Sequence, residues 1–145
     1  MQDEPSDGGV GFVDFRFTDE QQMWFDTLTA FMEKEVGREY IREHDESRTF
    51  PEEAYQKFAE RGWLGLLIPE EDGGLAADAV MYAIFCEVIA KYSLDFAAAI
   101  MTSMFTATNI ASHGTPEQKA AYLPGFLAGD IKFSISISEP GAGSD

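Results

Sequence analysis

Apolar residues recur along the chain at the three- and four-residue spacing of an amphipathic helix. The first such stretch follows residues 17–21, where Thr18 can accept a hydrogen bond from the third helical amide and Gln21 can reach back, the pattern of a capping box. Its apolar positions are Trp24, Leu28, Phe31, Met32 and Val36. The spacing predicts a helix that begins after Thr18 and extends to Val36.

Residues 39–51 lack the apolar spacing of the preceding stretch. From Glu39 to Thr49 charged residues crowd together without a clear apolar face, and Phe50-Pro51 disfavours helical geometry before the proline. The sequence predicts a break here. A short helix over residues 54–59 then ends at Gly62, a residue that readily adopts the left-handed conformation.

Three further helices are predicted in the second half. One covers Ala76–Tyr92, and the next covers Leu94–His113, which is apolar nearly all round and is therefore expected to be buried. The last begins at Thr115-Pro116-Glu117-Gln118, a cap followed by proline and a glutamine that can bond back, and ends at Gly129-Asp130.

The period then changes from helical to two. In residues 132–138 the side chains of Phe133, Ile135 and Ile137 alternate with three serines, which predicts a β-strand with one buried face. A single strand needs a neighbour, and this sequence offers none, so we expect the chain to be cut at a domain boundary. The predicted fold is mainly α, ending in one strand of a truncated β domain.

These patterns divide the chain into three parts. Residues 1–16 are predicted to be a flexible acidic arm, residues 17–130 an all-α domain, and residues 131–145 the first strand and loop of a second domain. An apolar fraction of 45% is enough to build a core for one domain.

The net charge of the chain argues against two classes of binding partner. The chain has 26 acidic and 10 basic residues, a formal net charge of −16, which argues against nonspecific binding to nucleic acid or to an anionic membrane. Its apolar runs are too short for a membrane helix. The acidic segment Met1–Asp7 is unlike a leader peptide, so a bacterial cytoplasm is the predicted location, with the mitochondrial matrix as the alternative.

The sequence offers no metal site. Its single cysteine, Cys86, and its two histidines, His44 and His113, do not form a cluster with ligand spacing. Cys86 is interpreted as a small buried hydrophobic residue, and His113 as a partner of the helix dipole.

A series of short motifs adds a resemblance to these observations. The motifs are, in chain order, Phe17-Thr18-Asp19-Glu20-Gln21, Phe50-Pro51, Gly62-Trp63-Leu64-Gly65-Leu66, Pro69-Glu70-Glu71-Asp72-Gly73-Gly74, Gly114-Thr115-Pro116-Glu117-Gln118-Lys119 with Tyr122-Leu123-Pro124, and Ser138-Glu139-Pro140-Gly141-Ala142-Gly143-Ser144-Asp145. Over nearly the whole chain after the arm, this order resembles the FAD-dependent acyl-CoA dehydrogenases. The resemblance implies a subunit with an N-terminal helical domain, a middle β domain and a C-terminal four-helix domain, of which this chain holds the first part and one strand of the second.

The resemblance also implies a chemistry. In the family a glutamate of the C-terminal domain removes the α-proton of an acyl-CoA while the β-hydrogen leaves as hydride to flavin N5. That glutamate has no counterpart here, so no catalytic residue is assigned, and we expect this chain alone to be inactive and to bind no stoichiometric FAD. Members form tetramers or dimers and pass electrons to an electron-transfer flavoprotein.

The resemblance further implies binding residues. Ile135, Ile137 and Ser138 match positions that contact the isoalloxazine of FAD, although many relatives have an aromatic residue where Ile135 stands. Gly143 and Ser144 match positions at the pyrophosphate, and Ser144 also matches one that touches the acyl-CoA thioester. Independently of the family, the glycines and backbone amides of residues 140–144 suit an anion-binding turn.

The predicted helix over Leu94–His113 supplies two candidate substrate residues. The resemblance implies that the acyl tail enters near this helix, where Ala98 and Met101 are the candidate contacts, and the alternative is that Met101 belongs to the core. If the tail reaches residues 97–99, these small side chains leave room for a longer or branched acyl group.

Two alternatives stay open. Flavin monooxygenases and oxidases of the same fold share this N-terminal pattern, and the residues that separate them lie outside it. A chain of this kind could also be a non-catalytic helical module that binds a partner through its strand and its most apolar helix.

Overall fold

A computed structural model describes residues 15–144 of the chain. Most of the predicted arm, residues 1–14, lies outside the described residues. The described elements are α1 (Asp19–Phe31), the π-helical turn η1 (Met32–Val36), α2 (Arg38–Ser47), α3 (Glu52–Glu60), the short 3₁₀ turns η2 (Trp63–Gly65) and η3 (Glu70–Asp72), α4 (Ala79–Ala90), α5 (Leu94–His113) and α6 (Pro116–Leu127).

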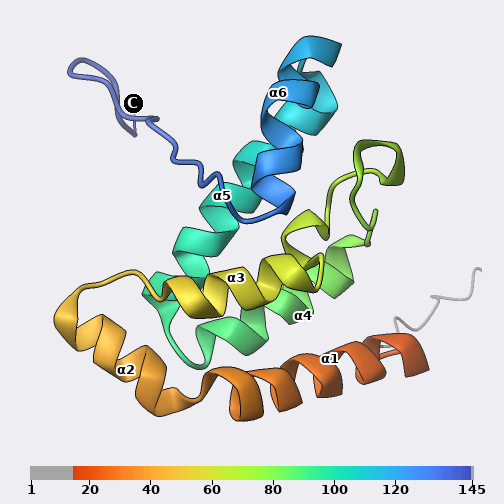
Figure 1. Ribbon diagram of the computed structural model, residues 1–145, viewed down its shortest axis with the longest axis vertical. Coiled ribbons are helices and arrows are strands. Elements are labelled where there is room, and N and C mark those ends of the chain that lie inside the picture. Colours follow the sequence, from red (N-terminus) through yellow and green to blue (C-terminus); the bar gives the residue numbers. More distant parts are fainter. Residues whose placement is uncertain (1–14, 145) are drawn as a thin grey trace, which may run out of the picture.

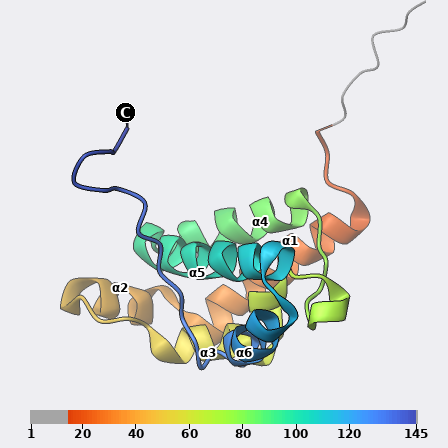
Figure 2. The same ribbon diagram turned by 90° about the horizontal axis from the view of Figure 1, so that it is seen from above.

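The helices pack in two layers. Helix α4 lies between α1 and α5, and α6 packs on α5 (Figure 1). Helices α3 and α6 lie together on one side of α4 and α5 (Figure 2). The chain after α6 passes α5 and then extends away from the helical body.

Both predicted capping boxes are confirmed. The Thr18 hydroxyl accepts from the Gln21 amide at 3.2 Å, and the Gln21 side chain accepts from the Thr18 amide at 3.0 Å. Thr115 and Gln118 make the same two bonds at the start of α6, at 3.3 and 2.8 Å. These reciprocal bonds satisfy amides that a helix leaves unpaired, which is why both boundaries could be predicted.

Helix α2 is a correction to the prediction. The charged stretch is helical as far as Ser47, although the sequence indicated no helix there, whereas the predicted break before Pro51 is confirmed, because residues 48–51 belong to neither α2 nor α3. One apolar residue, Ile41, is buried and holds α2 to the core, while Arg42 pairs with Glu39 and Glu46 on its exposed side. A short helix needs little apolar surface when its polar face is stabilised by such pairs.

Helix α4 begins later than predicted. The sequence suggested a start at Ala76, but Asp78 is the N-cap, and its side chain accepts from the Met81 amide at 2.8 Å. Ala76 has a φ of 48°, in the left-handed region, so it lies in a turn rather than in the helix.

Helix α5 has the predicted bounds but not the predicted burial. Phe96, Ile100 and Met104 are buried on one face, whereas Leu94 and Phe105 are 73% and 58% exposed on the other. Within the described residues, the neighbouring helices cover only one side of α5. None of the described helices combines the length and the apolar character that crossing a bilayer requires.

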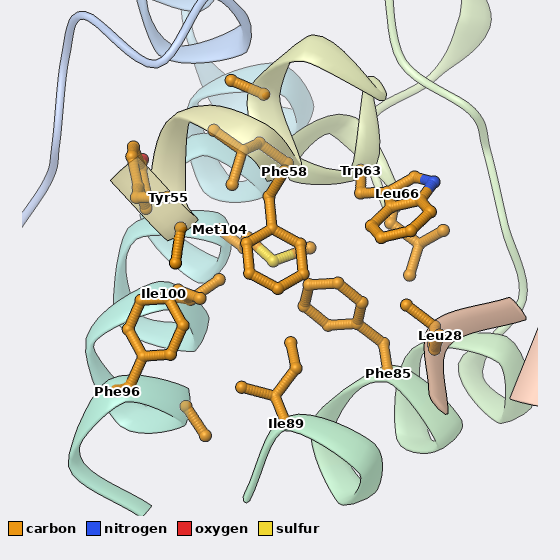
Figure 3. Packing of buried hydrophobic residues seen from close by; sticks show 14 of the residues in the cluster. Leu28, Tyr55, Phe58, Trp63, Leu66, Phe85, Ile89, Phe96, Ile100 and Met104 are labelled. Carbon is orange, nitrogen blue, oxygen red and sulfur yellow. The ribbon is translucent and has the colours of Figure 1, made fainter. Parts of the chain in front are cut away.

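The core is centred on the ring of Phe58 from α3. Its ring centroid lies 5.2 Å from that of Phe31, 5.6 Å from Phe85, 5.8 Å from Trp63 and 6.0 Å from Phe96. Figure 3 shows this ring among side chains that come from different helices. Edge-to-face and tilted pairs at these separations stabilise the packing beyond the burial of apolar area.

Cys86 and His113 lie where the sequence placed them on their helices. Cys86 on α4 is half-buried against the core, and burial raises the pKa of its thiol. His113 is exposed at the last residue of α5, the end at which a positive charge is favoured.

The segment after α6 does not form the predicted strand within the described residues. Phe133 is half-buried, its ring 5.7 Å from that of Phe126, but Ile137 is 79% exposed and Ile135 is also exposed. No neighbouring strand is present among residues 15–144 to complete a ladder or cover the apolar side. Residues 132–138 therefore keep the alternating pattern of a strand without forming one among the described residues.

Candidate functional site

A groove of about 380 Å³ lies where the start of α3, the middle of α5 and the segment after α6 meet. Its lining is formed by Phe50, Tyr55, Ala98, Ala99, Thr102, Ser103, Lys132, Phe133 and Ser134. The lining is predominantly apolar, with a few polar groups, which is typical of ligand sites.

Two buried hydroxyl groups belong to this groove. Tyr55 is 1% exposed, and its hydroxyl has no hydrogen-bond partner among the described residues. Burial raises the pKa of Tyr55, because the phenolate would lie away from water, and the neighbouring Ser103 hydroxyl offsets part of this rise. Ser103 is 2% exposed, and its hydroxyl accepts from the Phe133 amide at 2.9 Å.

A lysine borders the groove. Lys132 Nζ lies 2.6 Å from Glu52 Oε1, 4.7 Å from the centre of the Tyr55 ring and 5.4 Å from that of Phe50. The hydrogen bond from Lys132 lowers the pKa of Glu52. No local motif indicates this arrangement, since residues 52, 103 and 132 are distant along the chain.

The two predicted substrate residues lie in different surroundings. Ala98 is exposed in the groove together with Ala99, while Ala97 is buried. Met101 is not in the groove lining and packs, half-buried, against the core. The structure thus brings Ala98, but not Met101, into one cavity with the start of the C-terminal segment.

The predicted cofactor residues Ile135, Ile137 and Ser138 are exposed on the segment that leaves the helical body (Figure 1). Their backbone is unpaired within the described chain, so its amide and carbonyl groups stay available to a partner.

A turn separates these residues from Gly143 and Ser144. The Glu139 amide donates to the Ala142 carbonyl at 2.8 Å, and the Ala142 amide donates back at 3.1 Å. One amide of the predicted anion-binding segment, that of Ala142, is therefore used inside the turn, and Pro140 has none. Gly143 is open, with no heavy atom within 4 Å of where a Cβ would stand, and Ser144 is exposed.

Comparisons with known proteins agree with this architecture. The family model described as "Acyl-CoA dehydrogenase, N-terminal domain" matches residues 18–130. A probable acyl-CoA dehydrogenase of Bacillus subtilis is 34% identical over 137 residues, covering 92% of this chain and 35% of the relative. An NADH-dependent acryloyl-CoA reductase of Anaerotignum propionicum is 34% identical over 136 residues, covering 92% of this chain and 34% of the relative.

The solved structures give the same result. Butyryl-CoA dehydrogenase from Megasphaera elsdenii superposes with a TM-score of 0.76 at 27% identity, covering 90% of this chain and 35% of that one. The chain belongs to the acyl-CoA dehydrogenase family and has the fold of its N-terminal helical domain. It spans about a third of the length of the relatives that it matches.

Proposed function

We propose that this chain acts in an FAD-dependent acyl-CoA dehydrogenase, as the helical wall of the acyl site and the first segment along the flavin. The main support for the proposal is the groove that Ala98 of α5 lines together with residues 132–134. The chain that forms this groove belongs to the acyl-CoA dehydrogenase family. In this proposal FAD, when bound, would supply the acceptor for the β-hydride of an acyl-CoA, and the glutamate that the family resemblance implies would take the α-proton.

The groove suits the role of an acyl wall. Ala98 and Ala99 present only methyl groups to it, so a longer or branched acyl group has room beside α5. Phe50 and Phe133 add apolar surface to the lining. Met101 lies one helical turn from Ala98, and we propose that it contacts the acyl group where the substrate passes beyond the groove.

The segment after the groove suits the edge of a flavin. Ile135 and Ile137 offer exposed apolar surface to a flat ring system, and Ser138 offers a hydroxyl. The open backbone at Gly143 and the Ser144 hydroxyl and amide suit phosphate oxygens. In this assignment Ser144 also contacts the thioester end of the substrate, and residues 131–145 belong to the middle β domain.

Partners follow from the same proposal. We propose an acyl-CoA substrate, an electron-transfer flavoprotein as electron acceptor, a homodimer or homotetramer as the assembly, and a bacterial cytoplasm as the location. The match to an acryloyl-CoA reductase favours a second candidate, in which the same site adds hydrogen to an α,β-unsaturated acyl-CoA.

The test uses protein expressed from its complete reading frame, assayed with straight and branched acyl-CoAs and an artificial electron acceptor. We expect turnover, and we expect Ala98→Phe to lower kcat/KM for long and branched substrates about tenfold or more while short ones change little. Ala121→Phe, at an exposed alanine of α6, is the matched control and should leave all substrates unchanged. Activity with short substrates only, or equal effects of the two variants, would contradict the acyl-wall assignment.

A further inference from the structure

The chain is held firmly at the point where it leaves the helical body. The Ile131 amide donates to the Gly125 carbonyl at 3.0 Å, and the Phe133 amide donates to the buried Ser103 hydroxyl at 2.9 Å. The position between them, Lys132, reaches in the other direction, to α3. These contacts fix residues 131–133 against three different helices.

The contacts of Lys132 combine charge and aromatic surface. Its ammonium group pairs with Glu52 at 2.6 Å and lies over the rings of Tyr55 and Phe50. Glu52 is in the first turn of α3, where the helix dipole favours a negative charge. A cation held by a carboxylate and two ring faces has a defined position even though it is partly exposed.

The residues beyond this point lack such contacts. Within residues 15–144, no hydrogen bond joins residues 135–138 to the helical body. The direction of the segment is therefore set at residues 131–134. Ser138 lies up to roughly 20 Å from Lys132 along an extended chain, so a rotation of about 10° at Lys132 displaces it by about 3 Å.

We infer that Lys132 is a positioning residue that acts through Glu52: the pair clamps the start of the C-terminal segment to α3 and so aims residues 135–144. The consequence for flavin binding rests on the proposed function, whereas the clamp itself does not. A displacement of about 1 Å at a reacting site lowers the reaction rate by a large factor. The orientation that Lys132 and Glu52 impose therefore matters to any ligand that the segment binds.

Hydrogen exchange of the full chain tests the clamp without any ligand. Lys132→Met keeps the length of the side chain and removes the charge, and we expect exchange of the Phe133 amide to accelerate about fivefold to tenfold. Glu52→Gln should act in the same direction, and Lys132→Arg should stay within about twofold of the parent. The amides in the middle of α5 report global opening and should not change.

A matched control is present in α4. Lys91 pairs with Glu87 at 2.8 Å and lies 5.1 Å from the Phe25 ring, a similar combination of contacts away from the C-terminal segment. Lys91→Met should leave the Phe133 amide unchanged. An unchanged Phe133 amide in Lys132→Met and Glu52→Gln, or an equal acceleration in Lys91→Met, would overturn the clamp.

A second readout separates the clamp from the function. In protein from the complete reading frame, titration with FAD followed by quenching of flavin fluorescence should show weaker binding by Lys132→Met, by about fivefold or more, and recovery in Lys132→Arg. If the parent protein binds no FAD, the proposed function fails while the exchange result still decides the clamp. If FAD affinity is equal in all variants although exchange changes, the clamp does not serve flavin binding.

Discussion

The hydroxyl of Tyr55 gives a prediction whose sign is unusual for a buried residue. This group is buried and makes no hydrogen bond of good geometry among the described residues, although the Ser103 hydroxyl lies near enough to lower its pKa, and an unsatisfied buried polar group costs about 1–3 kcal/mol. Tyr55→Phe removes the oxygen and keeps the ring, which packs edge-on against Phe50 at 5.5 Å. We therefore expect the variant to be more stable by about 1 kcal/mol, a rise in Tm of roughly 4 °C for a domain of this size.

The assay is urea and thermal unfolding of the full chain, followed by circular dichroism. Tyr122→Phe is the matched control, because Tyr122 is exposed on α6, and its free energy of unfolding should stay within about 0.5 kcal/mol of the parent. A loss of stability in Tyr55→Phe would refute the reasoning, since it would show that the hydroxyl is bonded in solution, with the neighbouring Ser103 as the first candidate partner.

Three further predictions concern stability and pH. Phe58→Ala should lower the free energy of unfolding in urea by about 3–5 kcal/mol, whereas Phe105→Ala, at an exposed position of α5, should change it by less than about 1 kcal/mol. Ser93→Ala should cost about 1–2 kcal/mol in the same assay, because Ser93 caps α5 by accepting from the Phe96 amide at 3.1 Å. The hydrogen bond from Lys132 lowers the pKa of Glu52. The ionised Glu52 therefore stabilises the fold at pH values above the ordinary glutamate pKa of 4.5, and this stabilisation is lost as the pH falls through the lowered pKa. Unfolding at a series of pH values should show Glu52→Gln less stable than the parent near neutral pH by under about 1 kcal/mol, since the pair is screened by water, with the difference vanishing in acid.

Local signals in the sequence predicted much of the helical fold. The start of α1 follows from Thr18 and Gln21, and the start of α6 from Thr115 and Gln118, because a capping box is formed by residues three apart. The bounds of α5 were predicted from its long, largely apolar run, and Ser93 caps its start by accepting from the Phe96 amide. What its residues could not reveal was the exposure of Phe105, which depends on which face the other helices cover.

The structural features that the sequence did not predict share a physical cause, because each depends on tertiary packing rather than on a local pattern. Helix α2 escaped prediction because a single buried residue, Ile41, anchors it, which is too little for a periodic pattern. The groove escaped because Tyr55, Ser103 and Lys132 meet only through tertiary packing, and none of them belongs to a local motif. The cofactor residues proposed from resemblance, such as Ile137, lie on an exposed segment that makes no hydrogen bond to the helical body within the described residues.

The flavin content of protein expressed from its complete reading frame tests the central claim most directly. The account predicts a yellow protein with a visible flavin band, about one FAD per chain after denaturation, and bleaching of that band when an acyl-CoA substrate is added without an electron acceptor. A colourless protein that does not take up added FAD would contradict the assignment of residues 135–144 to a flavin site and, with it, the proposed function.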